Sequence, residues 1–166
     1  MIDLDVFDVR ILSALQQDGR QTGAALAETV PLSPSQIHRR IQRLEQAGLI
    51  AQYRAVLNPE GLGLGLMALT HVLLDRHEPE ITRRFREAVA RLPQILDAYA
   101  VTGDFDYILR VITPDLAAFS AFLSEDLMGI AGIRSVRSNV VLEAIKQTTA
   151  LPLGHLSPGG SGPARP

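Results

Sequence analysis

Residues Ser33–Glu45 read SPSQIHRRIQRLE, and this stretch decides the fold of the amino-terminal part of the chain. The side chain of Ser33 can accept hydrogen bonds from the amides at a helix start, and proline suits the first helical position, here Pro34. Gln36 completes a capping box, in which its side chain reaches back to the Ser33 amide. The sequence therefore predicts a helix that begins directly after Ser33.

The same stretch has one apolar face and one polar, basic face. Its apolar residues recur at i, i+4 and i+7, the spacing of one side of a helix: Ile37, Ile41 and Leu44. Polar and basic residues occupy the remaining surface: Ser35, Gln36, His38, Arg39, Arg40 and Arg43. This division predicts a helix that packs on a small core and shows its basic side outward.

Two shorter helical patterns precede this helix. An apolar face runs from Leu4 to Leu15, and the pattern ends near Asp18-Gly19. Thr22 can cap a second helix, which a tight Pro31-Leu32 turn separates from the basic one. Helix, helix, turn, helix is the layout of a helix-turn-helix domain, whose last helix enters the major groove of DNA.

In that layout the early residues of the last helix face base edges, and guanidinium groups suit the anionic phosphates. Ser35, Gln36, His38 and Arg39 are therefore the candidate base readers. Arg40 and Arg43 are the candidate phosphate contacts, and Ser33 at the helix start completes the candidate DNA-binding set.

Charge distribution supports a local basic surface. The whole chain has a formal net charge of −2, which argues against general polyanion binding. Residues 33–54 carry four arginines against the single Glu45, while Asp3, Asp5 and Asp8 lie at the start of the first helix. A basic helix face that is merely solvated is the alternative.

Length and composition indicate two small domains. The 166 residues are 46% apolar and include no cysteine, which excludes disulfides and thiolate metal sites. The longest apolar run, residues 62–74, is interrupted by Thr70 and His71 and is too short for a membrane span, so a soluble cytoplasmic protein is expected. The expected boundaries are a DNA-binding domain at 1–54, a glycine-rich linker at 55–65, a second domain at 66–147 and a disordered Pro/Gly-rich tail at 148–166.

The second domain has alternating strand and helix patterns. Strands are predicted at 66–74, 95–102, 106–112 and 135–145, and helices from about Pro79 to Pro93 and from Leu116 to Leu127. The order β-α-β-β-α-β is the ferredoxin-like arrangement, so the predicted fold class is α+β.

The predicted sheet is largely apolar on both faces. Tyr107, Leu109 and Val111 alternate with Ile108, Arg110 and Ile112, and Val140 and Leu142 alternate with Val141 and Ile145. Since both helices of this arrangement cover one face, the other face would leave an apolar patch exposed. We therefore expect a homodimer that pairs through the sheet and offers two reading helices to a two-fold DNA site.

A conspicuous segment, Thr102-Gly103-Asp104-Phe105-Asp106-Tyr107, joins the two central strands. Glycine and aspartate favour turns, so plain turn chemistry is one interpretation. In the other, a carboxylate faces the ammonium group of a zwitterionic small molecule while backbone amides face its carboxylate.

Together these features resemble the Lrp/AsnC family, the leucine-responsive or feast/famine transcriptional regulators. The resemblance covers roughly residues 4–147. It is carried by Leu4-Asp5 with Asp8 and Ile11-Leu12, by Leu32-Ser33-Pro34-Ser35 before Arg39-Arg40-Ile41, by Leu44-Glu45, Gly48-Leu49-Ile50 and Tyr53, by Gly103 to Tyr107, and by the closing Val140 to Gln147.

The resemblance implies a winged helix-turn-helix joined to an effector-binding domain that pairs through its sheet, with further assembly to tetramers or octamers. It implies that double-stranded DNA and a small-molecule effector, in this family an amino acid, are the partners. No cofactor or metal is expected, because the chain has no cysteine and its histidines lack metal-ligand spacing. Carried over residue by residue, it makes Gly103, Asp104 and Asp106 the effector-binding candidates, with Ser138 on the last strand as a further one.

Two alternatives stay open. Some relatives of this architecture decarboxylate a tetrapyrrole, but His38, His71, His77 and His155 lack metal-ligand spacing, and no serine has an evident histidine and aspartate partner. The region 99–107 also lacks the histidine and arginine of those enzymes, so no enzymatic activity is expected. The other alternative is a ligand-sensing oligomer without DNA binding, which the capped, arginine-rich helix disfavours.

Overall fold

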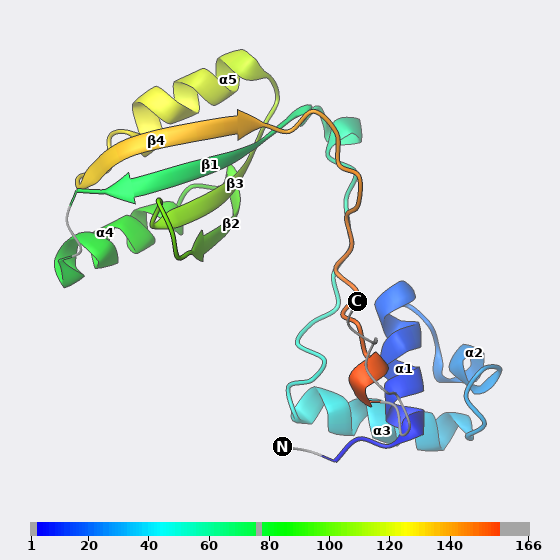
Figure 1. Ribbon diagram of the computed structural model, residues 1–166. Coiled ribbons are helices and arrows are strands. Elements are labelled where there is room, and N and C mark those ends of the chain that lie inside the picture. Colours follow the sequence, from blue (N-terminus) through cyan, green and yellow to red (C-terminus); the bar gives the residue numbers. More distant parts are fainter. Residues whose placement is uncertain (1–2, 76–77, 157–166) are drawn as a thin grey trace, which may run out of the picture. The chain divides into compact units, whose positions relative to one another are not determined.

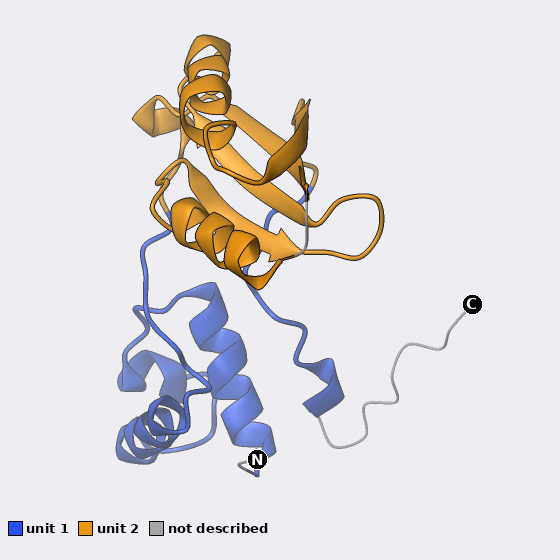
Figure 2. Cartoon of the chain, turned by 90° about the vertical axis from the view of Figure 1, so that its left-hand side faces the viewer, with its two compact units in different colours: residues 1–56, 146–166 blue, residues 57–145 orange. Residues whose placement is uncertain are grey.

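A computed structural model describes residues 3–75 and 78–156 of the chain. The chain forms two compact units (Figure 2). The first combines Met1–Val56 with Lys146–Pro166, and the second spans Leu57–Ile145. The first unit is therefore discontinuous in sequence, because the carboxy-terminal segment returns to it.

The first unit contains helices α1 (Val6–Gln17), α2 (Gly23–Ala27) and α3 (Pro34–Gln46) (Figure 1). Each begins after a side chain that accepts backbone amide hydrogen bonds: Asp5, Thr22 and Ser33. The predicted caps at Thr22 and Ser33 are confirmed. The core of this unit consists of residues with at most 1% exposure: Ile11, Leu26, Val30, Ile37 and Leu44. This is the predicted helix-turn-helix.

The segment after α3, residues 51–56, has no regular secondary structure and is exposed. Tyr53 donates a hydrogen bond from its hydroxyl to Glu45 at 3.0 Å, which holds the segment beside the end of α3. No strand is assigned within residues 3–65. The wing implied by the family resemblance is therefore absent from the described part of this unit.

The carboxy-terminal segment corrects a prediction. Residues 148–156 were expected to be disordered, but Gly154–Leu156 form a short 3-10 helix, η3, in the first unit (Figure 1). The Gln16 side chain of α1 accepts from the Leu151 amide at 2.5 Å and donates to the Leu151 carbonyl at 3.2 Å. Leucines in this segment and residues of α1 line a cavity of about 1220 Å³. The prediction of disorder rested on the high Pro/Gly content of the tail and did not take these leucines into account. The rest of the predicted tail, 157–166, lies outside the described residues.

The second unit has the predicted βαββαβ order. Its strands are β1 (Leu66–Leu74), β2 (Ile95–Ala100), β3 (Tyr107–Thr113) and β4 (Ile133–Val140), and its helices are η1 (Glu60–Leu62), α4 (Pro79–Val89), α5 (Leu116–Ala121) and η2 (Phe122–Leu127). In the described part of the chain the strands form one antiparallel sheet in the order β2-β3-β1-β4 (Figure 1). The ferredoxin-like arrangement is confirmed.

Both long helices cover the same face of this sheet. Phe85 of α4 and Phe119 of α5 share one core with Leu109 of β3. The helix predicted from Leu116 to Leu127 continues after α5 as η2, a π-helix in which Phe122 is buried and Leu123 is only partly buried. The next fully buried residue is Leu127, a five-residue step that fits the wider π turn.

The last strand is shorter than predicted. It ends at Val140, opposite Ala68 near the start of β1, so residues 142–145 find no partner strand within the described chain. Leu142 and Ile145 are almost fully exposed and belong to neither face of the sheet. On the face opposite the helices, β4 instead contributes three polar residues: Ser135, Arg137 and Asn139. The uncovered face is therefore mostly apolar over β1 and β3, apart from His71 and Arg110, and polar over β4.

Candidate DNA-recognition helix and effector loop

The start of α3 is fixed by a reciprocal capping box. The Gln36 amide donates to Ser33 Oγ at 3.3 Å, and the Ser33 amide donates to Gln36 Oε1 at 2.9 Å. The Ser33 hydroxyl also lies 2.9 Å from Gln36 Oε1. Two residues of the predicted DNA-binding set thus hold the helix start, although both remain exposed.

Three residues of the predicted set project from the exposed side of α3. Ser35, His38 and Arg39 are exposed, whereas Ile37 and Leu44 on the opposite side are fully buried. Arg39 forms no ion pair with any residue that the structure describes. The early turns of α3 therefore present two hydrogen-bonding groups and a guanidinium group to the outside.

Arg40 and Arg43, predicted as phosphate contacts, form ion pairs with acidic residues of α1. The Arg40 guanidinium lies 2.8 Å from Oδ1 of Asp8 and 2.8 Å from Oδ2 of Asp5. Arg43 pairs with the other oxygen of Asp8, whose side chain is 0% exposed. The hydrogen bond to Asp8 raises the pKa of Arg40, against the opposing effect of burial.

These four residues, here called the Asp8 cluster, also correct the predicted separation of acidic and basic residues: Asp5, Asp8, Arg40 and Arg43. The acidic residues of α1 were expected to lie apart from the basic helix, but Asp5 and Asp8 face Arg40 and Arg43. The partners are 32 and 35 positions apart in sequence, so neither helical periodicity nor local charge counting brings them together. The Phe7 ring, 5.6 Å from Arg40 Cζ, completes the contact between α1 and α3.

The loop between β2 and β3 is held to β1 by Asp106. The Asp106 carboxylate accepts a hydrogen bond from the Leu74 amide at 2.7 Å, and the Asp106 amide donates to the Val72 carbonyl at 3.0 Å. Gly103 has a φ of +114°, which favours glycine, and Asp104 beside it is exposed. Asp106 therefore shapes the loop, while Asp104 points its carboxylate outside the core.

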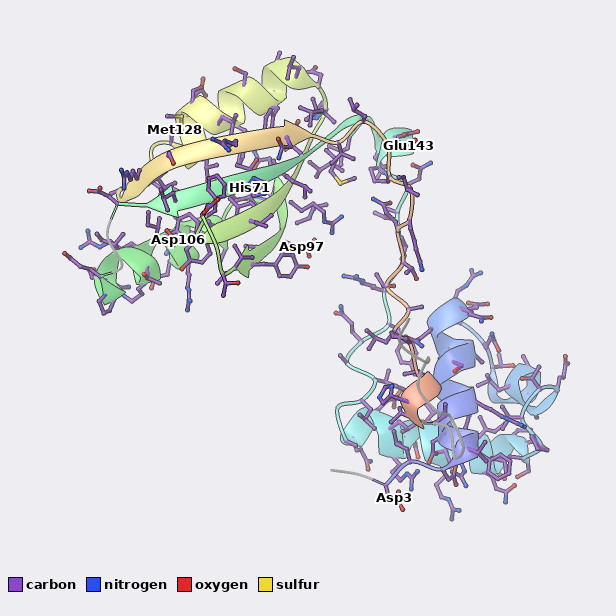
Figure 3. All side chains as sticks on the ribbon, viewed as in Figure 1. Asp3, His71, Asp97, Asp106, Met128 and Glu143 are labelled. Carbon is purple, nitrogen blue, oxygen red and sulfur yellow. The ribbon has the colours of Figure 1, made fainter. Side chains whose placement is uncertain are left out.

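An aromatic contact that sequence reasoning missed places the loop on the uncovered face of the sheet. The Phe105 ring stacks on His71 of β1 with 5.0 Å between centroids, and Arg137 of β4 lies over the same ring at 5.5 Å. His71 and Arg137 are partners in the β1–β4 register, and Figure 3 labels His71 and Asp106 in the same part of the sheet. Nδ1 of His71 is buried without a hydrogen-bond partner among the described residues.

Ser138 lies on the other face. Its hydroxyl is 3.1 Å from that of Thr70, which is fully buried beneath the helices. Within one chain the sheet separates Ser138 from the Phe105 side chain. The structure thus brings Gly103, Asp104 and Asp106 together in one loop but does not bring Ser138 to them.

Other kinds of site find little support in the described residues. Residues 3–75 and 78–156 include no group of three histidine, cysteine or acidic side chains placed to hold a metal ion. Within the same ranges no helix has the length and apolar character to cross a membrane. His77, considered above as a ligand candidate, lies outside the described residues.

A helix-turn-helix unit joined to a ferredoxin-like unit with a ligand-accessible loop defines a two-domain transcriptional regulator, and comparison with known proteins gives the family. The AsnC-type helix-turn-helix domain matches residues 4–45, and the Lrp/AsnC ligand binding domain matches residues 67–151. The chain belongs to the Lrp/AsnC family of transcriptional regulators.

Individual relatives agree. The leucine-responsive regulatory protein of Escherichia coli K12 is 39% identical over 149 residues, which are 90% of this chain and 91% of that protein. A transcriptional regulator of Neisseria meningitidis, solved as an L-Met complex, is 42% identical with a TM-score of 0.89 over 92% of this chain and 99% of that one. An AsnC-family regulator of Agrobacterium tumefaciens is 38% identical with a TM-score of 0.87 over the same shares.

Proposed function

We propose that this regulator binds duplex DNA as a symmetric homodimer, with α3 of each subunit in the major groove. The observation that carries this proposal is the exposed group of Ser35, His38 and Arg39 on the early turns of a helix whose start is fixed by a capping box. Residues at these positions of a recognition helix reach base edges. We also propose the cytoplasm as the site of action, because the DNA of the bacterial relatives lies there.

Arg39 is the sharpest test, because a guanidinium group can donate two hydrogen bonds to a guanine. Duplexes selected from a random pool by the wild-type protein provide the ligand. Arg39→Gln should weaken binding to the selected duplex by roughly 5- to 100-fold and relax its sequence preference. Arg86→Gln, on α4 of the other unit, removes the same charge and should leave both unchanged. Equal affinities for the two variants would contradict the proposed role of Arg39.

We further propose that an amino acid is the effector and that the loop carrying Gly103, Asp104 and Asp106 binds it. The L-Met complex of the Neisseria relative supports this ligand class. Asp104 offers an exposed carboxylate for the ammonium group. Ser138 remains a predicted effector contact. Because the sheet separates it from the Phe105 side chain within one chain, a site that includes Ser138 would need a residue from another subunit.

Calorimetry with individual amino acids tests this proposal. Asp104→Asn should lower the affinity for whichever amino acid binds the wild-type protein and leave the fold intact. Asp106→Asn is a poorer test, because it also removes the carboxylate that holds the Leu74 amide. Asp126→Asn, on η2, is the matched control. Unaltered affinity in the Asp104 variant would place the effector elsewhere.

The uncovered face of the sheet is the proposed dimer surface, with tetramers or octamers as further assemblies. Leu69 is 38% exposed and Tyr99 58% exposed on this face, where Tyr99 lies opposite Ile108 of β3. Leu69→Lys should shift the mass in solution, measured by light scattering, toward the monomer, because a lysine there would be desolvated in the interface. An unchanged mass would argue against pairing through this face.

A further inference from the structure

Both carboxylate oxygens of Asp8 accept hydrogen bonds inside the first unit. Oδ1 accepts from Arg40 at 2.8 Å, while Oδ2 accepts from Arg43 and, at 3.1 Å, from the Asp5 amide. The Asp8 side chain is 0% exposed, whereas 23% of the Arg40 side chain and 46% of the Arg43 side chain remain exposed. Two guanidinium groups at the surface of α3 thus share one buried carboxylate.

This arrangement changes the charge that α3 offers to DNA. Asp5 and Asp8 balance Arg40 and Arg43, so the four side chains together carry no net formal charge. Arg39, one position before Arg40, forms no ion pair among the described residues. The recognition helix therefore presents far less positive charge than its sequence suggests.

We propose that Asp8 is a positioning residue for DNA recognition, which holds Arg40 and Arg43 away from phosphates and so limits sequence-independent binding. The inference rests on the proposed DNA-binding function and deepens it. Phosphate contacts supply most of the affinity for any duplex, whereas base contacts supply the preference for one sequence. A helix whose arginines are neutralised by a buried aspartate depends more on the few side chains that reach bases.

Three variants that each remove one formal negative charge near the start of α1 separate this role from a general effect of charge. Asp8→Asn removes the shared carboxylate. Asp5→Asn removes the more exposed partner of Arg40 alone, and asparagine is an equally good helix cap. Asp3→Asn is the control, since Asp3 is exposed and forms no ion pair with an arginine among the described residues.

The measurement is the affinity for a random-sequence duplex and for a selected duplex across a range of salt concentrations. For Asp8→Asn we expect the slope of log K against log salt to steepen by about one, with several-fold tighter binding to the random duplex at low salt. The ratio of selected to random affinity should fall. Asp5→Asn should give a smaller change of the same sign, and Asp3→Asn should match the wild-type protein. Circular dichroism checks that each variant folds.

Two results would overturn the inference. Equal slopes for the three variants would show that the formal charge, not the Asp8 contact, governs binding. Unchanged or weaker binding to the random duplex by folded Asp5→Asn and Asp8→Asn would show that the arginines already contact phosphates in the wild-type protein. A wild-type protein that binds neither duplex would instead refute the proposed function, and the inference with it.

Discussion

Arg40 on α3 donates a hydrogen bond to Oδ1 of Asp8 on α1 at 2.8 Å, across 32 positions of sequence. The bond joins the first and last helices of the DNA-binding unit at a point where the carboxylate is completely buried. Since a buried charge that loses a partner keeps its desolvation cost, this contact should contribute to the stability of the unit as well as to its charge.

We expect Arg40→Met to lower the free energy of unfolding of the first unit by roughly 1–3 kcal/mol, because Asp8 would keep one guanidinium partner in place of two. Arg39→Met, one position earlier and exposed, should change it by less than about 0.5 kcal/mol. Hydrogen exchange of α1 and α3 peptides measures this unit separately from the sheet unit. Equal protection in both variants would show that the Arg40 contact adds no stability.

The aspartate at the start of α1 predicts a loss of stability in acid. Burial raises the pKa of Asp5, but hydrogen bonds from the Asp8 amide and the Arg40 guanidinium outweigh it, so the pKa lies below its ordinary value. A depressed carboxyl pKa stabilises the fold above the unfolded value of about 3.9, and this contribution disappears as the pH falls through the folded value.

Asp5→Asn should therefore reduce the acid sensitivity of the first unit below about pH 4 and leave the cap intact. Hydrogen exchange of the α1 peptides at several pH values, corrected for the intrinsic exchange rate, gives the comparison. Parallel pH dependence in the variant and the wild-type protein would assign the acid transition to other carboxyl groups.

The elements that the sequence predicted well are those set by local chemistry. The capping box of Ser33 and Gln36 and the alternation of side chains along β3 act over a few residues, so a single sequence reveals them. Which face of the sheet a side chain lies on can also be predicted, once the register of its strand is known. The contact between Ser138 and Thr70 could not be predicted, because it depends on which residue of β1 lies opposite Ser138.

Features that depend on contacts between residues far apart in the sequence could not be predicted. The Asp8 cluster joins helices that the sequence alone cannot place against each other, and His71, Phe105 and Arg137 meet through the sheet register and the path of a loop. The ordered carboxy-terminal segment was missed because the prediction of disorder used the Pro/Gly content of the whole tail. The packing of residues 148–156 depends instead on their leucines.

That segment should stabilise the DNA-binding unit. Ending the chain after Thr149 removes the two hydrogen bonds between Gln16 and Leu151 together with the leucines that line the cavity beside α1. We expect faster hydrogen exchange in α1, with little change in the strands. Ending the chain after Leu156 retains these contacts and is the control. Gln16→Ala should give a smaller effect, of about 1 kcal/mol.

The turn before β4 makes a test of packing in the sheet unit. Gly132 has a φ of +94°, and a Cβ built there would lie 2.4 Å from Cγ2 of Ile81 on α4. Alanine at this position adds backbone strain to a steric overlap, so Gly132→Ala should lower the free energy of unfolding of the sheet unit by roughly 2–4 kcal/mol.

A double-mutant cycle with Ile81→Ala separates the two causes. Ile81→Ala alone should destabilise the unit, because Ile81 packs against its core. In the double variant the overlap disappears and the backbone strain remains, so the combined loss should be smaller than the sum of the single losses by at least about 1 kcal/mol. Strict additivity, measured by hydrogen exchange of the β1 and β4 peptides, would mean that α4 moves to accept the new methyl group and that strain at the turn accounts for the whole cost.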